Sequence, residues 1–381
     1  MAKKYWVLVV FCNLFILSSN AQDNLFKPVT FDTSKLRIVF AGDMMGHIPL
    51  VNSCLTSDGT YNYDPIFNYV KPYFVNVDFA IANLEVPLAG RPYAGYPQFS
   101  SPDAVAIGLK HTGFNVLITA NNHALDRGKQ GFERTIQALD SIGIKHTGTF
   151  RTSDEKQLNH PLYIEKNNIK VAILNYTYGT NGFKIDLPDI INYIDTAEIR
   201  RDVVTSRENH ADFIIVTLHW GTEYERYPNL EQRKIAEFIR SIGADAVIGA
   251  HSHVIQTIER FSNLHNPTDL FPVVFSMGNF VSNQRERYKD GGIMVELDLE
   301  KAHNTKLKSC SYLPVWVYKG IYEGKMVYRL FTPDKYVEAS TFYNLSDSNK
   351  FKAQQFFDDT KLHLNNIEMM EKRELIGKEN N

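Results

Sequence analysis

Short runs of apolar residues, most of them β-branched or aromatic, recur along the chain and are separated by polar, glycine-containing segments. Runs of this length and content are typical of strands that are buried on both faces. They predict strands at residues 36–41, 79–82, 116–119, 171–174, 213–218, 246–248, 273–275 and 293–297.

A different spacing occurs between several of these runs. In residues 129–142, Phe132, Ile136 and Leu139 lie three or four positions apart, and a glycine follows the segment. Residues 230–242 repeat this pattern and also end before a glycine. Apolar residues at this spacing line one face of a helix, and glycine is a common helix terminator. We therefore expect helices at 129–142 and 230–242.

The alternation of strands and helices predicts an α/β fold with a largely covered sheet. Residues 36–300 contain no internal repeat and no long linker, so we expect one domain there. From 301 to 381 the sequence becomes charged and rich in aromatic residues. This part is expected to be a C-terminal extension with a terminal amphipathic helix at about 349–370.

The N-terminus has the pattern of a secretory signal peptide, predicted at residues 1–21. Lys3 and Lys4 precede an apolar run at 5–17, and small residues lead up to Ala21, the expected cleavage site. The alternative is an uncleaved membrane anchor, but Asn13 interrupts the run, which is shorter than the roughly 20 residues of a membrane-spanning helix. We expect an exported protein, in the periplasm or at the cell surface, with membrane association only through an uncleaved signal segment.

Composition excludes some classes of function. The 381 residues are 44% hydrophobic and 22% charged with a net charge of −2, so the chain lacks the basic surface of a nucleic-acid-binding protein. The cysteines are Cys12, Cys54 and Cys310, too far apart for a thiolate zinc site. Pairing of Cys54 with Cys310 stays open, as do the oligomeric state and the substrate.

Almost every predicted strand ends in a cluster of polar residues that can bind metals or transfer protons. In open α/β sheets, ligands bind beyond the carboxyl ends of the strands, so these loops are expected to meet at one place. The clusters are Gly42-Asp43-Met44-Met45-Gly46-His47, Asn83-Leu84-Glu85, Asn121-Asn122-His123 followed by Asp126, His219-Trp220-Gly221-Thr222-Glu223, Gly249-Ala250-His251-Ser252-His253 and Ser276-Met277-Gly278-Asn279-Phe280.

Imidazole and carboxylate ligands suit divalent ions such as Zn, Mn or Fe, and an amide carbonyl can complete the shell. The loops hold enough such ligands for two ions, a pair that can stabilise the attacking and leaving oxygens of a phosphoryl displacement. Individual motifs also have alternative, structural interpretations. Asp126 could cap a helix beginning near Arg127, and His251 and His253, expected on one side of an extended segment, could be structural histidines.

With these motifs, the chain resembles the bacterial capsule-synthesis CapA family, also called poly-γ-glutamate synthesis proteins, which is related to the calcineurin-like metallophosphatases. The resemblance covers about residues 36–299, and its six motifs occur in order. It implies a four-layer α-β-β-α fold, with a two-layer β sandwich flanked by helices and the motifs at one rim. The polymer of the capsule or cell envelope, or its precursors, is the partner that it implies.

The resemblance also implies roles for the residues. The implied metal ligands fall into two sets that share Glu85 as the bridge: Asp43 and His253 for one ion, and Asn122, His219 and His251 for the other. His123 would act beside the substrate as a general acid, oriented by Asp126. Two positions differ from the wider metallophosphatase pattern. Met45 stands where a histidine is usual, and the bridge is glutamate instead of aspartate. His47, two residues after Met45, is a further expected metal ligand.

Two classes of function follow. One is a metal-dependent hydrolase for a phosphoester or amide bond, and the other is a non-catalytic accessory or binding protein of capsule or polyglutamate assembly. A serine hydrolase or a nucleotide-binding enzyme is not supported, because the chain lacks their characteristic glycine-rich motifs in the segments that follow its strands. The residues expected to contact substrate are Glu223, Tyr224 and Asn279, and further candidates for lining the cleft are Tyr178, Arg226 and Arg285.

Overall fold

The computed structural model describes residues 33–185, 188–266 and 269–370. Every element below belongs to the compact unit that begins at Ser34. The predicted signal peptide at 1–21 lies outside the described residues. Among those residues, no helix combines the length and hydrophobicity needed to cross a bilayer.

Within the described residues, the larger of two main sheets has nine strands. One half of it is the parallel set β1–β2–β3–β4, and β14, β15 and β16 continue from β1 in antiparallel order. The strands are β1 (Ser34–Met44), β2 (Phe79–Leu84), β3 (Val116–Ile118), β4 (Lys145–Thr147), β14 (Gly291–Lys301), β15 (Thr305–Tyr322) and β16 (Lys325–Phe331), with β13 (Asn279–Val281) beside β1 and β17 (Glu368–Met369) beside β15.

The second main sheet has six strands in the described part of the chain. Parallel strands form its centre, and an antiparallel strand closes each edge. In spatial order they are β11 (Ile258–Ser262), β12 (Leu270–Val274), β10 (Ala246–Ala250), β9 (Phe213–His219), β7 (Ile169–Thr177) and β6 (Leu162–Lys166); a separate ribbon pairs β5 (Thr149–Phe150) with β8 (Ile190–Ile191).

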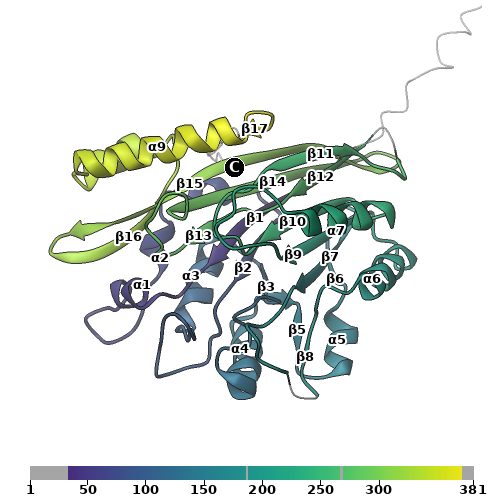
Figure 1. Ribbon diagram of the computed structural model, residues 1–381, viewed down its shortest axis with the longest axis horizontal. Coiled ribbons are helices and arrows are strands. Elements are labelled where there is room, and N and C mark those ends of the chain that lie inside the picture. Colours follow the sequence, from purple (N-terminus) through teal and green to yellow (C-terminus); the bar gives the residue numbers. More distant parts are fainter. Residues whose placement is uncertain (1–32, 186–187, 267–268, 371–381) are drawn as a thin grey trace, which may run out of the picture. The chain divides into compact units, whose positions relative to one another are not determined.

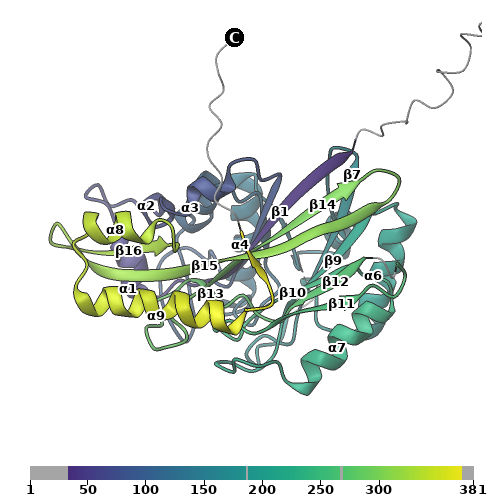
Figure 2. The ribbon, with the colours of Figure 1, turned by 90° about the horizontal axis from the view of Figure 1, so that it is seen from above.

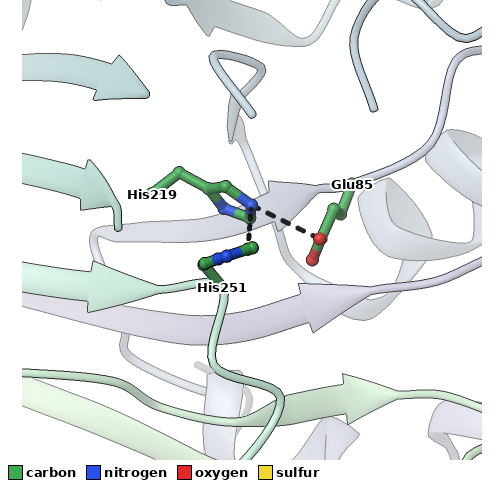
Figure 3. A group of neighbouring side chains, drawn as sticks. All are labelled: Glu85, His219 and His251. Atoms are coloured by element: carbon green, nitrogen blue, oxygen red, sulfur yellow. Dashed lines mark hydrogen bonds and ion pairs between the residues drawn. The ribbon is translucent and has the colours of Figure 1, made fainter. Parts of the chain in front are cut away.

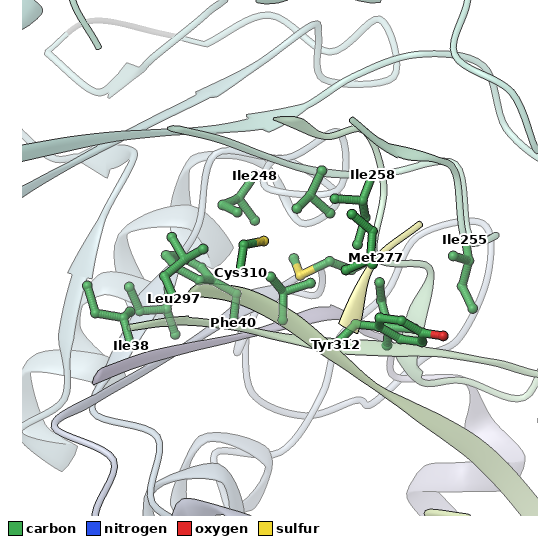
Figure 4. Packing of buried hydrophobic residues seen from close by; sticks show 14 of the residues in the cluster. Ile38, Phe40, Ile248, Ile255, Ile258, Met277, Leu297, Cys310 and Tyr312 are labelled. Atoms are coloured by element: carbon green, nitrogen blue, oxygen red, sulfur yellow. The ribbon is translucent and has the colours of Figure 1, made fainter. Parts of the chain in front are cut away.

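The two sheets pack face to face, and alternate residues of β1 show how the sequence produces this arrangement. Ile38 and Phe40 point into the core between the sheets, where they join Ile248 of β10 and Ile258 of β11 (Figure 4). Val39, between them in sequence, belongs to the cluster on the opposite face of the larger sheet. Successive strand residues face opposite sides, so the uninterrupted apolar stretch 38–41 is buried on both faces.

Helices cover the outer faces of both sheets (Figure 1). The larger sheet packs against α1 (Ile48–Ser53), α2 (Asp64–Phe67), the 3₁₀ helix η1 (Lys71–Phe74), α3 (Ala104–Thr112) and α4 (Gly128–Ile142). The smaller sheet packs against α6 (Thr196–Glu208) and α7 (Leu230–Ser241), and α5 (Ser153–Asn159) precedes β6. The layers are therefore α-β-β-α, which confirms the predicted fold class.

The last helices also contribute to the core. After β16 come α8 (Tyr336–Phe342) and α9 (Asp347–His363), and α9 lies along β15 (Figure 2). Phe356 of α9 belongs to the same hydrophobic cluster as Ile38 and Phe40. The residues after 301, predicted to be an extension, thus add strands to the larger sheet and a helix that covers part of its inner face.

The strands and helices predicted from the sequence agree closely with those of the structure. Each predicted strand overlaps an observed one, with 116–119 and 273–275 running one residue past the ends of β3 and β12, and the helices expected at 129–142 and 230–242 are α4 and α7. The helix expected at 349–370 is α9, which ends at His363 because the chain then turns into β17. Local signals account for the helix ends: Asn229 and Gln232 form a capping box at the start of α7, and Gly143 adopts a left-handed conformation after α4.

Candidate metal centre

The predicted metal ligands meet where the carboxyl ends of the central strands of both sheets lie. Asp43 is near the end of β1, Glu85 directly follows β2, and His219 is the last residue of β9. His251 and His253 directly follow β10. All five side chains are buried. The topology therefore gathers, in one buried place, residues that are up to 210 positions apart in the sequence (Asp43 to His253).

Glu85 lies at the centre of this cluster. Its Oε1 is 3.4 Å from Nε2 of His219 and 3.9 Å from Nε2 of His253. Neither carboxylate oxygen accepts a hydrogen bond from the described residues. Burial, followed by the negative charge of Asp43, raises the pKa of Glu85 well above its ordinary value. A buried carboxylate without donors is costly unless cations are present, so this residue points to a cation site.

Two groups of ligand atoms share Glu85. Glu85, His219 and His251 form the first (Figure 3), and Asp43, Glu85 and His253 form the second. In each group the ligand atoms lie within 4.8 Å of one another. The spacing within each group is suited to coordination of one ion, and Glu85 is the side chain common to both.

The first group has an additional oxygen. Nδ1 of His251 is 3.1 Å from Nε2 of His219, and the carbonyl Oδ1 of Asn122 is 2.8 Å from the same nitrogen. Burial lowers the pKa of His219 well below its usual value and lowers that of His251 to about 3. Both rings are therefore neutral at pH 7, the state in which imidazole binds metals. The donor set fits a divalent ion such as Zn, Mn or Fe.

In the second group, hydrogen bonds keep Asp43 ionised. Burial alone would raise its pKa, but the hydrogen bond and charge of His253 and a hydrogen bond from Asn83 outweigh burial and lower it. Oδ2 of Asp43 is 3.3 Å from Nδ1 of His253, and Oδ1 accepts a 2.8 Å hydrogen bond from Asn83. Asp43 also accepts a 3.3 Å hydrogen bond from the backbone N–H of His251. The aspartate is thus held as an anion facing Glu85.

The backbone at the two β10 histidines differs from the expectation. An extended segment was predicted to place both side chains on one side, but φ is +99° at His251 and +57° at His253. Residues other than glycine rarely adopt this region, and such strain is concentrated at functional sites. The extended conformation was therefore the wrong prediction, although both rings do reach the centre.

His123 and Asp126 form a pair beside the metal groups. Nδ1 of His123 is 2.8 Å from Oδ2 of Asp126, and the same oxygen accepts a 2.7 Å hydrogen bond from the backbone N–H of Phe99. The Phe99 ring meets the His123 ring edge-on at 4.8 Å. Asp126 does not cap α4, whose N-cap is Arg127 without a side-chain hydrogen bond. The helix-cap alternative is therefore wrong, and the carboxylate orients the histidine instead.

His47 lies near the centre but belongs to neither ligand group. It precedes α1, its Nδ1 accepts a 3.4 Å hydrogen bond from the backbone N–H of Asn283, and its ring meets Phe99 edge-on. Burial, followed by the nearby His253, lowers its pKa to about 4. Its role as a metal ligand stays a prediction.

The residues expected to contact substrate occupy different environments. Glu223 and Tyr224 are exposed in the loop after β9, and the Tyr224 ring stacks on that of His253 at 6.1 Å. Asn279 is fully buried behind His253, with Oδ1 3.1 Å from its Nδ1 and Nδ2 donating to its carbonyl. This placement makes Asn279 a neighbour of a ligand, turned away from the surface.

Three further candidates for the cleft were proposed from sequence. Tyr178 adjoins the centre, with its ring 4.6 Å from that of His251. Arg226 stacks on Tyr288, and Arg285 donates to the carbonyl of Val317. Of the three, therefore, only Tyr178 contacts a ligand residue of the two groups.

Two asparagines near the centre were not assigned roles from sequence. Asn83 bonds Asp43 and lies 3.2 Å from Nδ1 of His219, and Asn181 lies 3.2 Å from Asn122 and 3.4 Å from His123. The sequence contained signals that would have identified both asparagines. Asn83 lies within the motif that holds Glu85, and Asn181 follows β7, so the same rule of strand ends would have included it.

A separate surface hollow of about 510 Å³ lies at the amino-terminal ends of β9 and β10. Arg207, Asp245 and His265 are among its lining residues, and none of the predicted site residues is. Asp245 there is satisfied by Arg207 and by the backbone N–H of Ile214. The strand ends opposite this hollow therefore carry the candidate chemistry.

Comparison with known proteins agrees with the resemblance seen in the motifs. The chain is 29% identical over 372 residues to the PGA biosynthesis protein CapA of Bacillus subtilis (strain 168), which covers 91% of this chain and 92% of that protein. It is 27% identical over 281 residues to the capsule biosynthesis protein CapA of Bacillus anthracis, covering 69% and 64%.

Solved structures with some similarity include NAD nucleotidase NadN of Haemophilus influenzae, with a TM-score of 0.47, 13% identity, and coverage of 87% of this chain and 68% of that one. The sulfate thiohydrolase SoxB follows at a TM-score of 0.36, with 13% identity and coverage of 67% and 38%. The family model described as bacterial capsule synthesis protein PGA_cap matches residues 37–284, which span every motif of the centre. The chain belongs to the bacterial capsule synthesis protein PGA_cap family.

Proposed function

We propose that this chain is an exported metal-dependent hydrolase that acts on a polymer of the capsule or cell envelope through two divalent ions. The observation that carries the proposal is Glu85, a fully buried carboxylate shared by two groups of ligand atoms and without hydrogen-bond donors among the described residues. Divalent ions held by these two groups would neutralise the carboxylate.

The ligand sets follow the two groups. His219, His251 and the carbonyl of Asn122 would hold one ion, and Asp43 and His253 the other, with Glu85 between them. When bound, such a pair supplies the activation of water and the stabilisation of negative charge that hydrolysis of a phosphoester or amide bond requires. Mn, Zn and Fe all accept this set of ligands.

The His123–Asp126 pair is suited to proton transfer. Because Nδ1 of His123 donates to the carboxylate, Nε2 is the nitrogen that can give or take a proton. Phe99 holds the aspartate through its backbone N–H and packs on the imidazole. We assign His123 as the general acid that protonates the leaving group, and Asp126 as the residue that orients it.

The polymer and the location rest on the family and the N-terminal sequence. The relatives are described as capsule or PGA biosynthesis proteins, which favours a capsule polymer such as poly-γ-glutamate or its precursors as the partner. The segment 1–21 has the pattern of a signal peptide, which favours export to the periplasm or cell surface.

The test combines metal analysis with turnover. Purified wild-type protein is expected to contain about two ions per chain and to hydrolyse phosphodiester or γ-glutamyl test substrates. The His251→Ala variant is expected to lose metal and activity. His111→Ala is the matched control, because His111 is exposed on α3 and contacts Asp64 instead of the centre. Equal activity in wild type and His251→Ala contradicts the proposal.

One observation favours a second candidate, a non-catalytic accessory or binding protein of capsule assembly. Met45, which stands where the wider metallophosphatase pattern has a histidine, is buried, and His47 belongs to neither ligand group. The second ion would thus have fewer protein ligands. Metal bound at the expected sites without turnover of either class of substrate would favour this candidate.

A further inference from the structure

One buried asparagine connects the segment of His123 to the segment of Glu85. Asn121 lies in the loop after β3, two residues before His123, and is 1% exposed. Its Nδ2 donates a 2.8 Å hydrogen bond to the carbonyl of Leu84, the residue directly before Glu85. Its Oδ1 accepts a 3.1 Å hydrogen bond from the backbone N–H of His123. A single side chain thus joins the end of β2 to the backbone of the histidine.

The bond to His123 closes a turn that fixes the backbone of this residue. An asparagine oxygen that accepts from the N–H two residues later forms an Asx turn, which imitates a backbone turn. Backbone hydrogen bonds continue the turn, from Ala124 to the carbonyl of Asn121 at 3.3 Å and from Asp126 to the carbonyl of His123 at 3.1 Å. Residues 121–126 are therefore held as consecutive turns, which bring the His123 ring to the Asp126 carboxylate.

A separate contact holds the start of the same loop. The backbone N–H of Ala120 donates a 2.8 Å hydrogen bond to Oδ1 of Asn175, a fully buried residue of β7 in the smaller sheet. The loop is therefore attached to the smaller sheet through Ala120 and to the end of β2 through the Asn121 side chain. Loss of the Asn121 amide leaves the first attachment in place, so its effect should be confined to residues 121–123.

The proposed reaction depends on where this loop places His123. A general acid has to lie within hydrogen-bond reach of the leaving atom, at about 2.6–3.2 Å. A displacement of about 1 Å is enough to lower a rate about 100-fold. The Asn121 amide is bonded on one side to the backbone beside Glu85 and on the other to the backbone of His123. It is therefore placed to set the position of the acid relative to the shared carboxylate.

We propose that Asn121 is a positioning residue for hydrolysis, which holds the general acid His123 at a fixed place relative to Glu85. The inference rests on the proposed function and adds to it a residue that acts through His123. The bond between the leaving group and the phosphorus or acyl carbon breaks as water adds to that atom, and Nε2 of His123 gives its proton to the departing oxygen or nitrogen. Asn121 affects the rate only through this proton.

The experiment compares two leaving groups in the metal-loaded, full-length protein. Phosphodiester and γ-glutamyl ester substrates are each prepared with p-nitrophenol and with an aliphatic alcohol as the leaving group. p-Nitrophenolate departs without a proton, whereas an alkoxide requires one. Asn121→Ala should therefore lower kcat for the alkyl substrate about 100-fold and change kcat for the p-nitrophenyl substrate little. Its metal content should equal that of wild type, because Glu85, His219 and His251 lie in other segments.

Two further variants separate positioning from a general loss of structure. His123→Ala should show the same selective loss, and adding Asn121→Ala to it should lower kcat no further, because the two residues act as one unit. Asn115→Ala is the matched control. Asn115 also bonds the backbone of this part of the sheet, accepting from Ala80 and donating to Asp78, but at the start of β2 instead of its end. This variant should keep wild-type kcat with both leaving groups.

The outcomes distinguish failure of the inference from failure of the proposed function. Equal effects of Asn121→Ala on the two leaving groups, whether both rates fall or neither does, would overturn the inference, as would a further loss in the double variant. These results leave turnover by wild type in place, so they refute the positioning role alone. Wild type without metal, or without turnover of any of these substrates, refutes the proposed function and the inference with it.

Discussion

Replacing Glu85 by glutamine tests the metal centre through protein stability. Glutamine has nearly the same shape as glutamate but carries no charge. In the metal-free protein, Glu85 is fully buried, and neither of its oxygens has a hydrogen-bond donor among the described residues. The substitution therefore removes a group whose charge is costly to bury, while it leaves the surrounding packing in place.

The expected magnitude follows from two opposing costs. A buried ion costs several kcal/mol even after relaxation, and an unsatisfied neutral amide costs about 1–3 kcal/mol. We therefore expect metal-free Glu85→Gln to be more stable than metal-free wild type by about 1–3 kcal/mol at pH 7. With metal the order should reverse, because an ion at 1,000 times its dissociation constant adds about 4 kcal/mol to wild type and little to the variant.

The effect has a defined pH dependence. The folded-state pKa of Glu85 is raised above the ordinary value of 4.5, so its contribution to stability is fully present below pH 4.5 and is lost as pH rises through the folded-state pKa. The advantage of metal-free Glu85→Gln should thus disappear below pH 4.5.

The assay is urea unfolding of both proteins, in EDTA and in excess Mn²⁺, at pH 4 and pH 7. Glu165→Gln is the control, since Glu165 is exposed on β6, and it should follow wild type throughout. If wild type and Glu85→Gln unfold at the same urea concentration in EDTA and gain equally from metal, the assignment of Glu85 is refuted.

Three other predictions concern the same molecule. Burial lowers the pKa of His251 to about 3, so metal-free wild type should lose about 1.4 kcal/mol per pH unit from this residue as pH falls below 6.5; His251→Asn should show a shallower decline in urea unfolding. Phe40→Ala removes a fully buried ring between the sheets and should cost about 3–5 kcal/mol in the same assay, and a loss under 1 kcal/mol would contradict the packing. Cys54 and Cys310 are buried free thiols, so mass spectrometry should find them alkylated after unfolding but not before, with or without reductant.

The parts of the fold that depend on local pattern could be predicted from sequence. The run at 38–41 is apolar at every position, and β1 is buried on both faces there, as that pattern requires. Gly143 ends α4, and Asn229, the capping residue before Leu230, sets the start of α7. Such signals act within a few residues, so one sequence is enough to read them.

Features that depend on contacts between distant residues could not be predicted. The polar, charged pattern of 301–331 does not reveal that β15 and β16 continue the larger sheet, because that pairing is fixed by β14. The backbone of His251 and His253 adopts positive φ through contacts with Asp43 and Asn279. Asn279 likewise was expected to contact substrate because its motif follows a strand, but pairing of β13 with β1 buries it.

The sequence predicted which residues form the core of the candidate centre, but not how each side chain is oriented. The rule that ligands bind beyond strand ends brought together Asp43, Glu85, His219, His251 and His253, and the structure places all five in the two groups. The rule does not say which loop residues turn inward. His47 therefore stood among the candidate ligands, although the chain directs it toward Asn283.

Anomalous X-ray diffraction from crystals of the purified protein, measured at the Mn, Fe and Zn absorption edges, tests the central claim most directly. The account predicts two peaks about 3.5–4 Å apart, one beside His219 and His251, the other beside Asp43 and His253, with Glu85 in contact with both. Crystals of active protein that show no peak at Glu85, or a single ion bound elsewhere, would contradict it.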